Sequence, residues 1–495
     1  MRRRQRIQFD GSLLRKTSVA LDSVVGVLSP ASALKRAQYR FAYDVLSKHR
    51  THTKRSGTWG FGDQQLDEHT QSELREIARD MSRNNPVIKG MLKTERDGVV
   101  GQSAKVQARS GDNKFDEDIE AAWKERMLLS RCDLTGRFNF NQLLRKAYLS
   151  YRRDGDFFCL FADDGIQPVE GEQVGTPWGK AQPEHYDIIN GVAVSKQTKK
   201  IIGYYIGTPN KYGYIEADAW KNYPAEAVHH MFNPDRFSHS RGEPALTAAM
   251  EWIDKISGYI DAELVAAKVN ACFSMFVSRE APFDMPDAYT SGVESGGTDP
   301  DTGERYEKIS PGTVMYGQIN EKATPIGQMR PGSQFGEFVS KMLAFVGRPI
   351  GMPLMLITLD YSGATFMNAR IAYQQVQRIW ENEQEDVVKP FVARAYKWFI
   401  DQLVKEDKKF DRPGKYSHET ICTRWPYVDP LKEAMADAKQ LENKTTNRTQ
   451  ICARQGLEFG EVVEKLKSEE DLLKEKGLVA DDSTAKPNME KNSSQ

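Results

Sequence analysis

Three histidines and an aspartate lie close together in the sequence, at His229, His230, Asp235 and His239. Imidazole and carboxylate groups are the ligands that zinc and similar metals use in proteins. Neighbouring residues of a strand point to opposite faces of a sheet, so at most one of His229 and His230 joins the other two residues. A metal site in this segment is one hypothesis for the chemistry of the chain.

Other patterns associated with catalysis are incomplete. Gly179 and Lys180 are followed by Ala181, where a phosphate-binding loop requires Ser or Thr. The stretch 299–304 resembles a calcium loop but has Gly303 where a ligand belongs, which favours a plain turn. No Gly-x-Ser-x-Gly motif is present. The residues therefore predict a protein without a catalytic site and without a cofactor.

The composition is that of a soluble globular protein with several domains. The chain has 495 residues, of which 39% are hydrophobic and 28% charged. Its cysteines are too far apart to form a zinc or redox motif, and they are typical of a reducing compartment; they are Cys132, Cys159, Cys272, Cys422 and Cys452. We find no apolar run long enough for a membrane-spanning helix and no signal peptide, which predicts a protein outside membranes that is not secreted.

Charge is distributed unevenly, although Lys and Arg together equal Asp and Glu at 69 each. Residues 1–55 contain thirteen Lys or Arg and three Asp. We expect residues 1–64 to form a basic arm that ends in a flexible segment at 57–63. Such an arm grips a phosphate backbone or an acidic neighbour, or it is a solvated tail, and the sequence leaves these alternatives open. Residues 479–495 lack large apolar side chains apart from Met489 and are predicted to be disordered.

The first half of the chain combines helices with a β-rich region. Apolar residues recur at helical spacing over 70–96, where Pro86 predicts a break, and again over 138–151. From 154 to 214, short segments rich in β-branched and aromatic residues alternate with turn signals, and 227–232 is a further predicted strand. The fold class is therefore predicted to be α+β.

The second half contains long helical patterns. Helical periodicity continues for about thirty residues after Pro244, with a mildly acidic outer face. A segment at 281–332 rich in Pro, Gly and Asp predicts a small β module on loops, and a helix resumes at Phe335. A second long helix is expected over 365–403, interrupted by Pro390.

The order of these segments resembles that of the portal proteins of tailed bacteriophages, specifically the lambda-like family. The resemblance extends from about residue 65 to 478. It rests on ARDMSRNNPVIKGMLKTERDGVVG (78–101), EAAWKE (120–125), GVAVSKQTKKIIGYYI (191–206), VHHMFNPDRFSHSRGEPAL (228–246) and VDPLKEAMA (428–436).

The resemblance implies the phage portal fold, with long stem helices, β-rich wing and clip modules and a helical crown. Each chain would be one subunit of a twelve-membered ring at a unique capsid vertex, through which double-stranded DNA enters during packaging and leaves at infection. It implies a wing at 65–243 with a return segment at 405–428, stem helices at 244–278 and 333–347, a clip at 279–332, a channel-loop region at 348–364, a long bent helix at 365–404 and crown helices at 429–478.

The resemblance also implies partners and a location. The clip would face the terminase large subunit during packaging and later the head–tail connector or adaptor proteins, while the major capsid protein would surround the ring. Within the clip, the docking candidates are Arg279, Glu280, Asp299, Asp301, Glu304 and Arg305. The protein would be assembled in the host cytoplasm, would be part of the virion at the portal vertex and would have no membrane partner.

The loop after Pro353 falls where the family places the narrowest collar around the DNA. Its candidate channel residues are Thr358, Asp360, Tyr361, Ser362, Gly363 and Ala364. The stretch 358–364 has no Lys or Arg. A collar of basic side chains would bind the phosphates and slow a sliding duplex, so the absence of such groups suits a channel. We expect Ser362 and Gly363 to let the backbone bend and Tyr361 to offer a weakly polar surface.

Two hypotheses of different classes follow. The first is a structural DNA conduit and docking ring without an active site. The second is a metal-dependent nucleic-acid-processing enzyme that uses His229, Asp235 and His239. Assembly into a large ring favours the first, whereas a monomer or dimer with metal-dependent cleavage of DNA favours the second.

Overall fold

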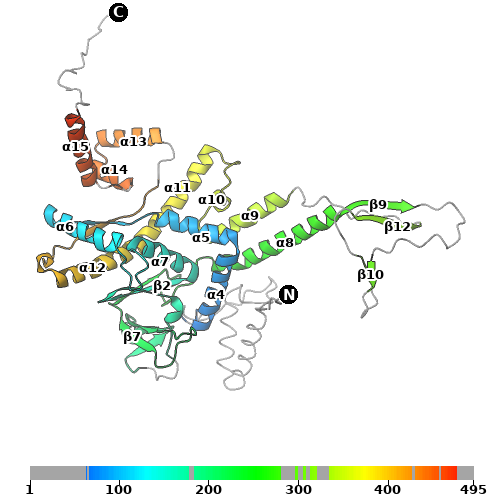
Figure 1. Cartoon of the computed structure of the whole chain (residues 1–495), viewed down its shortest axis with the longest axis horizontal. Helices are drawn as coiled ribbons and strands as arrows, with labels where there is room; N and C mark the ends of the chain where they lie inside the picture. The colour runs from blue at the N-terminus through cyan, green and yellow to red at the C-terminus, as the bar shows by residue number, and fades with distance from the viewer. Residues whose placement is uncertain are drawn as a thin grey trace, which may run out of the picture. The chain divides into compact units, whose positions relative to one another are not determined.

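The fold is α+β, as predicted (Figure 1). The described residues form two compact units. The computed structural model describes residues 63, 66–177, 183–279, 296–298, 305–307, 313–319, 334–425, 430–455, 457 and 459–476. Unit 1 contains 63–91, 236–239 and 243–364 of these residues, and unit 2 contains 92–235, 240–242 and 365–476. The predicted arm, apart from residue 63, and the predicted tail at 479–495 lie outside the described residues. Within the described part, no helix is both long and apolar enough to cross a membrane.

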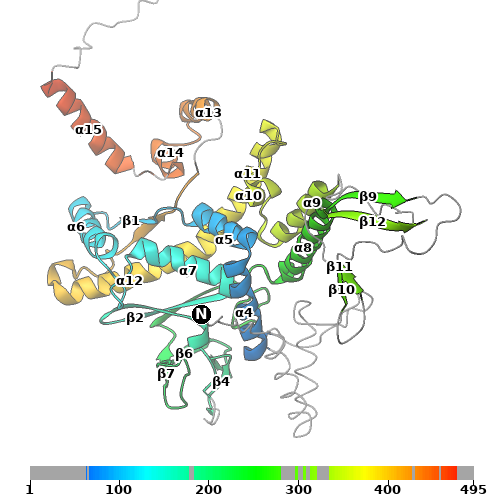
Figure 2. The same cartoon turned by 45° about the vertical axis from the view of Figure 1, so that its right-hand side comes forward.

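Unit 1 is built mainly from helices. They are α4 (Glu68–Asn84), the first residues of α5 (Pro86–Val99), the 3-10 turn η4 (Thr247–Ala249), α8 (Met250–Cys272), α9 (Phe335–Gly347), the 3-10 turn η6 (Arg348–Ile350) and α10 (Leu354–Thr358). Its strands are β9 (Phe273–Arg279), β10 (Gly296–Thr298), β11 (Arg305–Glu307) and β12 (Thr313–Ile319). Strands β9 and β12 pair in parallel and lie side by side in both views, whereas β10 and β11 are antiparallel (Figures 1 and 2).

Aromatic side chains pack α8 against α9. The ring of Tyr259 lies 5.8 Å from that of Phe335 and 4.9 Å from that of Phe338. Nearer the start of α8, the rings of Trp252 and Phe345 lie 5.9 Å apart. A long insertion separates the two helices in the sequence, and these contacts hold them together. Aromatic pairs stabilise such an interface by more than their buried area alone.

Unit 2 combines helices with three sheets. Its helices are the rest of α5, α6 (Asn113–Trp123), η2 (Lys124–Leu129), α7 (Phe140–Asp154), η3 (Gly171–Gln173), α11 (Phe366–Glu383), η7 (Gln384–Val388), α12 (Lys389–Glu406), η8 (Lys408–Phe410), α13 (Pro430–Glu442), α14 (Arg448–Arg454) and α15 (Phe459–Glu475). Its strands are β1 (Lys105–Ala108), β2 (Asp156–Ala162), β3 (Gly165–Val169), β4 (Tyr186–Ile189), β5 (Val192–Ser195), β6 (Ile201–Gly207), β7 (Trp220–Pro224), β8 (Val228–Phe232) and β13 (His418–Ile421).

All three sheets of unit 2 are antiparallel. Their strand orders are β1-β13, β3-β2-β8 and β4-β5-β6-β7. One core joins the two larger sheets through Phe158, Val192, Tyr204, Ile206 and Val228. The alternation expected of half-buried strands is visible in β6, where Tyr204 and Ile206 are buried and Tyr205 between them is not.

A second core of unit 2 surrounds Phe391 on α12. Its ring stacks on Phe140 of α7 at 5.8 Å and contacts Phe157 and Phe161 of β2 at 6.2 and 6.3 Å. Helix α7 is fixed locally as well, because Asn139 and Gln142 form a reciprocal capping box at its start. Helices α7 and α12 and strand β2 are thereby held together by interdigitated aromatic rings.

Proline accounts for two predicted breaks. The pattern over 70–96 forms two consecutive helices, and Asn85 between them is extended because the residue before a proline avoids helical geometry. The predicted long helix around Pro390 is α11, the π-helical segment η7 and α12, with Pro390 in the first turn of α12. Pro390 has no N–H to donate, so a regular α-helical ladder cannot run through it.

The helix expected over 244–278 is shorter than the sequence indicated. After a 3-10 turn, α8 ends at Cys272, and the last residues of that range form β9. The physical reason is strand pairing, because residues 273–279 form hydrogen bonds with β12, which lies forty residues later in the sequence. The aromatic and β-branched residues Phe273, Phe276 and Val277 suit a strand as well as a helix, and the helical spacing alone did not separate the two.

Candidate functional site

The candidate channel loop is a turn stabilised by its own side chains. The hydroxyl of Thr358 donates to the carbonyl oxygen of Leu354 at 3.0 Å and accepts from the amide of Asp360 at 3.3 Å. The Asp360 carboxylate accepts from the amide of Ser362 at 2.9 Å, and the amide of Ala364 donates to the carbonyl of Tyr361 at 3.1 Å. The six candidate residues are thus brought together as one continuous loop.

The bend of the loop depends on a residue that sequence reasoning missed. Leu359 has a φ of 54°, in the left-handed region that non-glycine residues rarely adopt. Gly363, to which we assigned the bend, has no positive φ, and a side chain there would meet no atom within 4 Å. The leucine side chain is 65% exposed, so burial does not explain its strained backbone. Only the coordinates could show this, because leucine carries no sequence signal for such a conformation.

The surface of this loop is free of positive charge. No Lys or Arg occurs between Arg348 and Arg370, and Tyr361 is 52% exposed. The amide of Ser362, which donates to Asp360, lowers the pKa of that carboxyl below its ordinary value, so Asp360 carries a negative charge at neutral pH. A polyanion that passes this loop would meet no cationic group on it.

The candidate docking residues of the predicted clip lie mostly outside the described residues. Glu280, Asp299, Asp301 and Glu304 are not among those the structure describes. Arg279 is the last residue of β9 and Arg305 the first of β11. The predicted small β module is confirmed as far as the structure describes it, with a parallel β9–β12 pair and a short antiparallel β10–β11 pair.

The two adjacent histidines point to opposite faces of β8, as predicted from the strand. His230 forms a 2.9 Å hydrogen bond with Asp156, and its ring stacks between Phe158 and Phe232. The ring of His229 lies 5.2 Å from that of Phe391, and burial lowers its pKa from 6.5 to about 3. Over the part of the chain that the structure describes, no group of three or more His, Cys, Asp or Glu is placed to hold a metal ion.

A buried guanidinium organises the residues around this histidine pair. Arg241 donates through Nε to the carboxylate of Asp156 at 2.7 Å, and its remaining nitrogens donate to the backbone carbonyls of Gly171, Val174 and Asn190 at 2.7–3.0 Å. The amide of the next residue, Gly242, also donates to Asp156 at 2.7 Å. This segment carries part of the family resemblance, but the sequence predicts no role for Arg241, because exposed and buried arginines look alike in a sequence.

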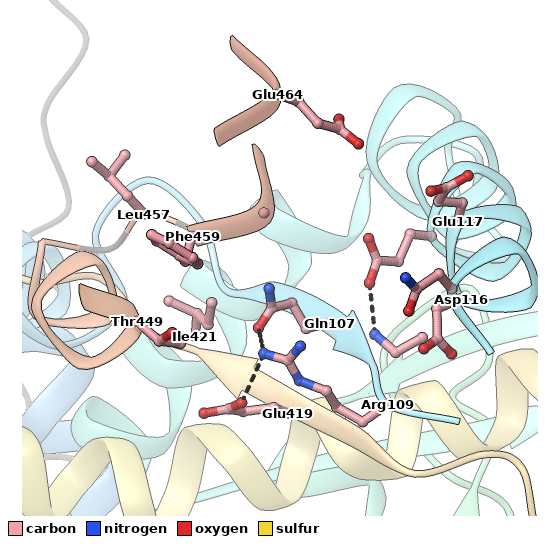
Figure 3. A pocket seen from close by; sticks show the side chains of 14 residues that line it. Gln107, Arg109, Asp116, Glu117, Glu419, Ile421, Thr449, Leu457, Phe459 and Glu464 are labelled. Carbon is pink, nitrogen blue, oxygen red and sulfur yellow. Dashed lines mark hydrogen bonds and ion pairs between the residues drawn. The ribbon is translucent and has the colours of Figure 1, made fainter. Parts of the chain in front are cut away.

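A cleft of about 400 Å³ opens in unit 2 between the β1–β13 pair and the helices that follow it (Figure 3). The residues that line it come from α6, β1, β13 and the α14–α15 region; the charged ones are Arg109, Asp116, Glu117, Glu120, Glu419 and Glu464. Apolar side chains contribute as well, among them Ile421, Leu457 and Phe459. In Figure 3, Glu464 on α15 extends toward α6, which carries Asp116 and Glu117.

The single arginine of the cleft is engaged by its neighbours. Arg109 donates to the side-chain oxygen of Gln107 at 2.6 Å and to Glu419 at 3.3 Å (Figure 3). The Glu120 carboxylate accepts from the amide of Ala108 at 2.8 Å, and Asp116 accepts from the amide of Ser110 at 2.9 Å. Because five carboxylates face one guanidinium, the cleft carries an excess of negative charge. Sequence reasoning missed it, since α6 and α15 are more than three hundred residues apart.

Comparison with known proteins places the chain in a family. The family model described as "Phage portal protein, lambda family" matches residues 52–384, more than half of the chain. The chain belongs to this family. The resemblance drawn from the sequence is therefore confirmed, and the matched part of this phage portal protein includes α8, α9 and the loop at 358–364.

One relative of this phage portal protein is the "Probable portal protein" of Halomonas phage phiHAP-1. It is 21% identical over 427 residues, which are 82% of this chain and 81% of the relative. Three solved structures are similar at 13% identity with a TM-score of 0.38: the neck of an empty gene transfer agent particle with C6 symmetry (78% of this chain, 93% of that one), the virion of the native particle (85% and 98%) and the neck of the native particle with C12 symmetry (79% and 94%).

Proposed function

We propose that this phage portal protein forms a twelve-membered ring at a unique capsid vertex and that double-stranded DNA passes through the centre of the ring. Residues 358–364 line the narrowest part of the channel. The observation that carries this assignment is the exposed loop without any Lys or Arg between Arg348 and Arg370. The family to which the chain belongs supports the ring.

The chemistry of the loop suits a duplex that must slide. Each phosphate neutralised by a basic side chain releases counterions and increases the affinity for DNA, so a basic collar would hold the duplex in place. The hydroxyls, the tyrosine ring and the ionised carboxylate of this loop do not bind phosphates in this way. Asp360 instead repels phosphates and keeps the duplex away from the wall.

Exposed apolar side chains on the helices of unit 1 support assembly into an oligomer. Several large ones on α8 and α9 are exposed in the single chain: Trp252, Leu264, Val265, Phe338 and Phe345. Apolar patches of this kind mark surfaces that contact another protein. In the ring, neighbouring copies of α8 and α9 would cover them.

The remaining assignments extend the same proposal. The wing is 65–243 with its return at 405–428, the stem is 244–278 with 333–347, and the clip at 279–332 docks the terminase large subunit and later the head–tail connector or adaptor proteins. The long bent helix is 365–404, the crown is 429–478, and the major capsid protein surrounds the ring in the virion. The protein acts as a structural conduit, without a catalytic site, a cofactor or a membrane partner.

The mass of the purified protein tests this proposal. Twelve chains of 56.1 kDa give a particle of about 670 kDa, which native mass spectrometry resolves from smaller assemblies. Negative-stain images should show a central hole in that particle. A monomer or dimer under all assembly conditions, or a closed particle without a hole, would contradict the conduit.

A further inference from the structure

Two buried carboxylates share one arginine inside unit 2. Arg152 on α7 lies 2.7 Å from Glu95 on α5 and 3.3 Å from Glu383 at the end of α11. The side chains of Glu95, Arg152 and Glu383 are 1%, 11% and 12% exposed. Helices α5 and α7 lie side by side in both views (Figures 1 and 2). With both carboxylates ionised, this network would hold one negative charge without a partner, which is unfavourable in a protein interior.

The residues around this network supply no second positive charge. The charged or titratable groups that act on Glu383 come from α5, α7 and η7, and they are Glu95, Tyr148, Tyr151, Arg152 and Asp386. Burial raises the pKa of both tyrosines above the ordinary value, so neither is charged at neutral pH. The Oε2 atoms of Glu95 and Glu383 are buried and accept no hydrogen bond from the residues that the structure describes. One ionised and one protonated carboxyl would balance the single guanidinium.

The geometry indicates which carboxyl takes the proton. Glu95 lies nearer to the guanidinium than Glu383 does, so Arg152 stabilises the negative charge of Glu95 more strongly. Burial raises the pKa of Glu383 above its ordinary value of 4.5, and the charge of Glu95 adds to this rise, although Arg152 opposes it. Glu383 is therefore the carboxyl whose neutral form the site favours.

Glu383 occupies the junction of two helices. It is the last residue of α11, and the π-helical segment η7 begins at the next residue. The side-chain amide of Gln384 is buried there and donates to the backbone carbonyls of Val99 and Thr423 at 2.7 and 2.9 Å. The junction between α11 and α12 is thus held by one neutral contact and by one contact whose charge depends on a proton. Short π-helical segments within α-helices often occur at functional sites.

We infer that Glu95, Arg152 and Glu383 form a proton-linked latch, in which a proton on Glu383 holds the end of α11 against α5 and α7 and its loss loosens that contact. An ionised Glu383 repels Glu95 within the same buried site. The hydrogen bonds of Gln384 carry no charge, so they continue to hold η7. This inference goes beyond the conduit and does not rest on the ring or the channel.

The latch has a defined dependence on pH. Because the pKa of Glu383 is higher in the folded chain than its ordinary value of 4.5, the contact contributes fully to stability below pH 4.5 and is lost as the pH rises through the folded value. His229 has the opposite dependence, since burial lowers its pKa and its contribution is lost on acidification. A comparison of variants with the wild type at each pH therefore separates the two groups.

Hydrogen exchange followed by mass spectrometry tests the latch in the full-length protein. Glu383→Gln replaces the protonated carboxyl by a neutral group of nearly the same shape. In the wild type, the protection of the amides in the last turn of α11 should fall at least about threefold between pH 5 and pH 8, after correction for intrinsic exchange. In E383Q the protection should stay constant over this range.

A second variant removes the other carboxylate of the network. In Glu95→Gln, the guanidinium of Arg152 has only Glu383 to balance, so Glu383 stays ionised and paired. The protection of the last turn of α11 should then be independent of pH in E95Q as well. A purely structural role for Glu95 would lower the protection and leave its dependence on pH unchanged.

A matched control changes an exposed carboxylate of the same junction. Glu385 belongs to η7 and pairs with Lys389 at the surface. In Glu385→Gln, the dependence of the protection on pH should match that of the wild type. Urea unfolding shows whether all three variants retain the wild-type fold before their exchange is compared.

Two results for E383Q would overturn the inference. If it keeps the wild-type dependence on pH, the proton lies on another group. If it is less protected than the wild type at every pH, Glu383 is an ordinary ionised partner of Arg152. Should E383Q not fold, E95Q decides, because a wild-type dependence on pH in that variant contradicts a guanidinium shared by two carboxylates.

Discussion

Arg241 and Asp156 lie 2.7 Å apart, Nε to Oδ2, and both side chains are fully buried in unit 2. The pair is surrounded by further hydrogen bonds, because Arg241 also donates to three backbone carbonyls and Asp156 also contacts His230 and the amide of Gly242. The carbonyls belong to the connections after β3 and β4, whereas Asp156 begins β2. One guanidinium thus joins segments from both larger sheets of unit 2.

Removing this guanidinium should destabilise unit 2. In Arg241→Leu, Asp156 loses its buried counter-charge and three carbonyls lose their donors, so we expect the free energy of unfolding to fall by about 3–5 kcal/mol. Urea denaturation measures this loss. Lys405→Ala is the control, because Lys405 and Asp163 also lie 2.7 Å apart but are both exposed, and its cost should stay below about 1 kcal/mol. Equal effects of the two substitutions would contradict the role of Arg241.

Acid should weaken unit 2 through His229. Burial lowers the pKa of His229 from 6.5 to about 3, so between these pH values the unfolded chain binds a proton that the folded chain does not. The free energy of unfolding should therefore fall with decreasing pH, by about 1.4 kcal/mol per unit from this residue. His229→Leu should show a shallower decline between pH 6 and pH 4 in urea titrations at several pH values. A variant whose decline is as steep as that of the wild type would show that His229 is not the residue concerned.

The backbone of the loop at 358–364 should be relaxed by glycine at 359. Leu359 has a φ of 54° and an exposed side chain, so Leu359→Gly removes strain without removing packing and should raise the free energy of unfolding by about 1 kcal/mol. Gly363→Ala should change stability by less than about 0.5 kcal/mol, since no atom lies within 4 Å of a side chain there. Differential scanning calorimetry compares the two variants. If Gly363→Ala changed the free energy of unfolding more than Leu359→Gly did, Gly363 and not Leu359 would determine the bend of the loop.

Two glycines of α5 should respond in opposite ways to the same substitution. A side chain at Gly98 would lie 2.6 Å from the indole ring of Trp380, so Gly98→Ala should cost about 1–3 kcal/mol. Gly90 has open space around it, and Gly90→Ala should stabilise the helix by about 0.5–1 kcal/mol. Thermal unfolding of both variants provides the comparison. A stabilised Gly98→Ala would show that Trp380 does not press against α5.

Basic charge in the loop at 358–364, which we propose lines the channel, should slow the passage of DNA. Ser362→Lys places up to twelve ammonium groups around the proposed channel, and each phosphate contact adds about one unit to the slope of affinity against salt. Packaging and ejection should therefore be slower at low salt and recover as salt rises. Ser362→Gln, of similar length but neutral, should behave as the wild type. Equal rates for both variants at all salt concentrations would place the loop away from the DNA.

The sequence alone was sufficient for features that depend on neighbouring residues. Pro86 and Pro390 marked the helix breaks, and the adjacent histidines of β8 were correctly assigned to opposite faces. The family could be inferred from ordered motifs, and the absence of Lys and Arg from 358–364 is a property of composition. Local signals suffice here because a proline or a period-two pattern acts on the backbone within a few residues.

Tertiary structure decided everything that depends on distant contacts. Pairing with β12 turned 273–279 into a strand, burial made Arg241 the centre of a network, and the approach of α15 to α6 gathered Glu117 and Glu464 around one cleft. The left-handed backbone of Leu359 involves no such contact, but it was equally unpredictable, because leucine rarely adopts this conformation. The physical reason is that packing energies between segments tens to hundreds of residues apart outweigh local preferences of about 1 kcal/mol.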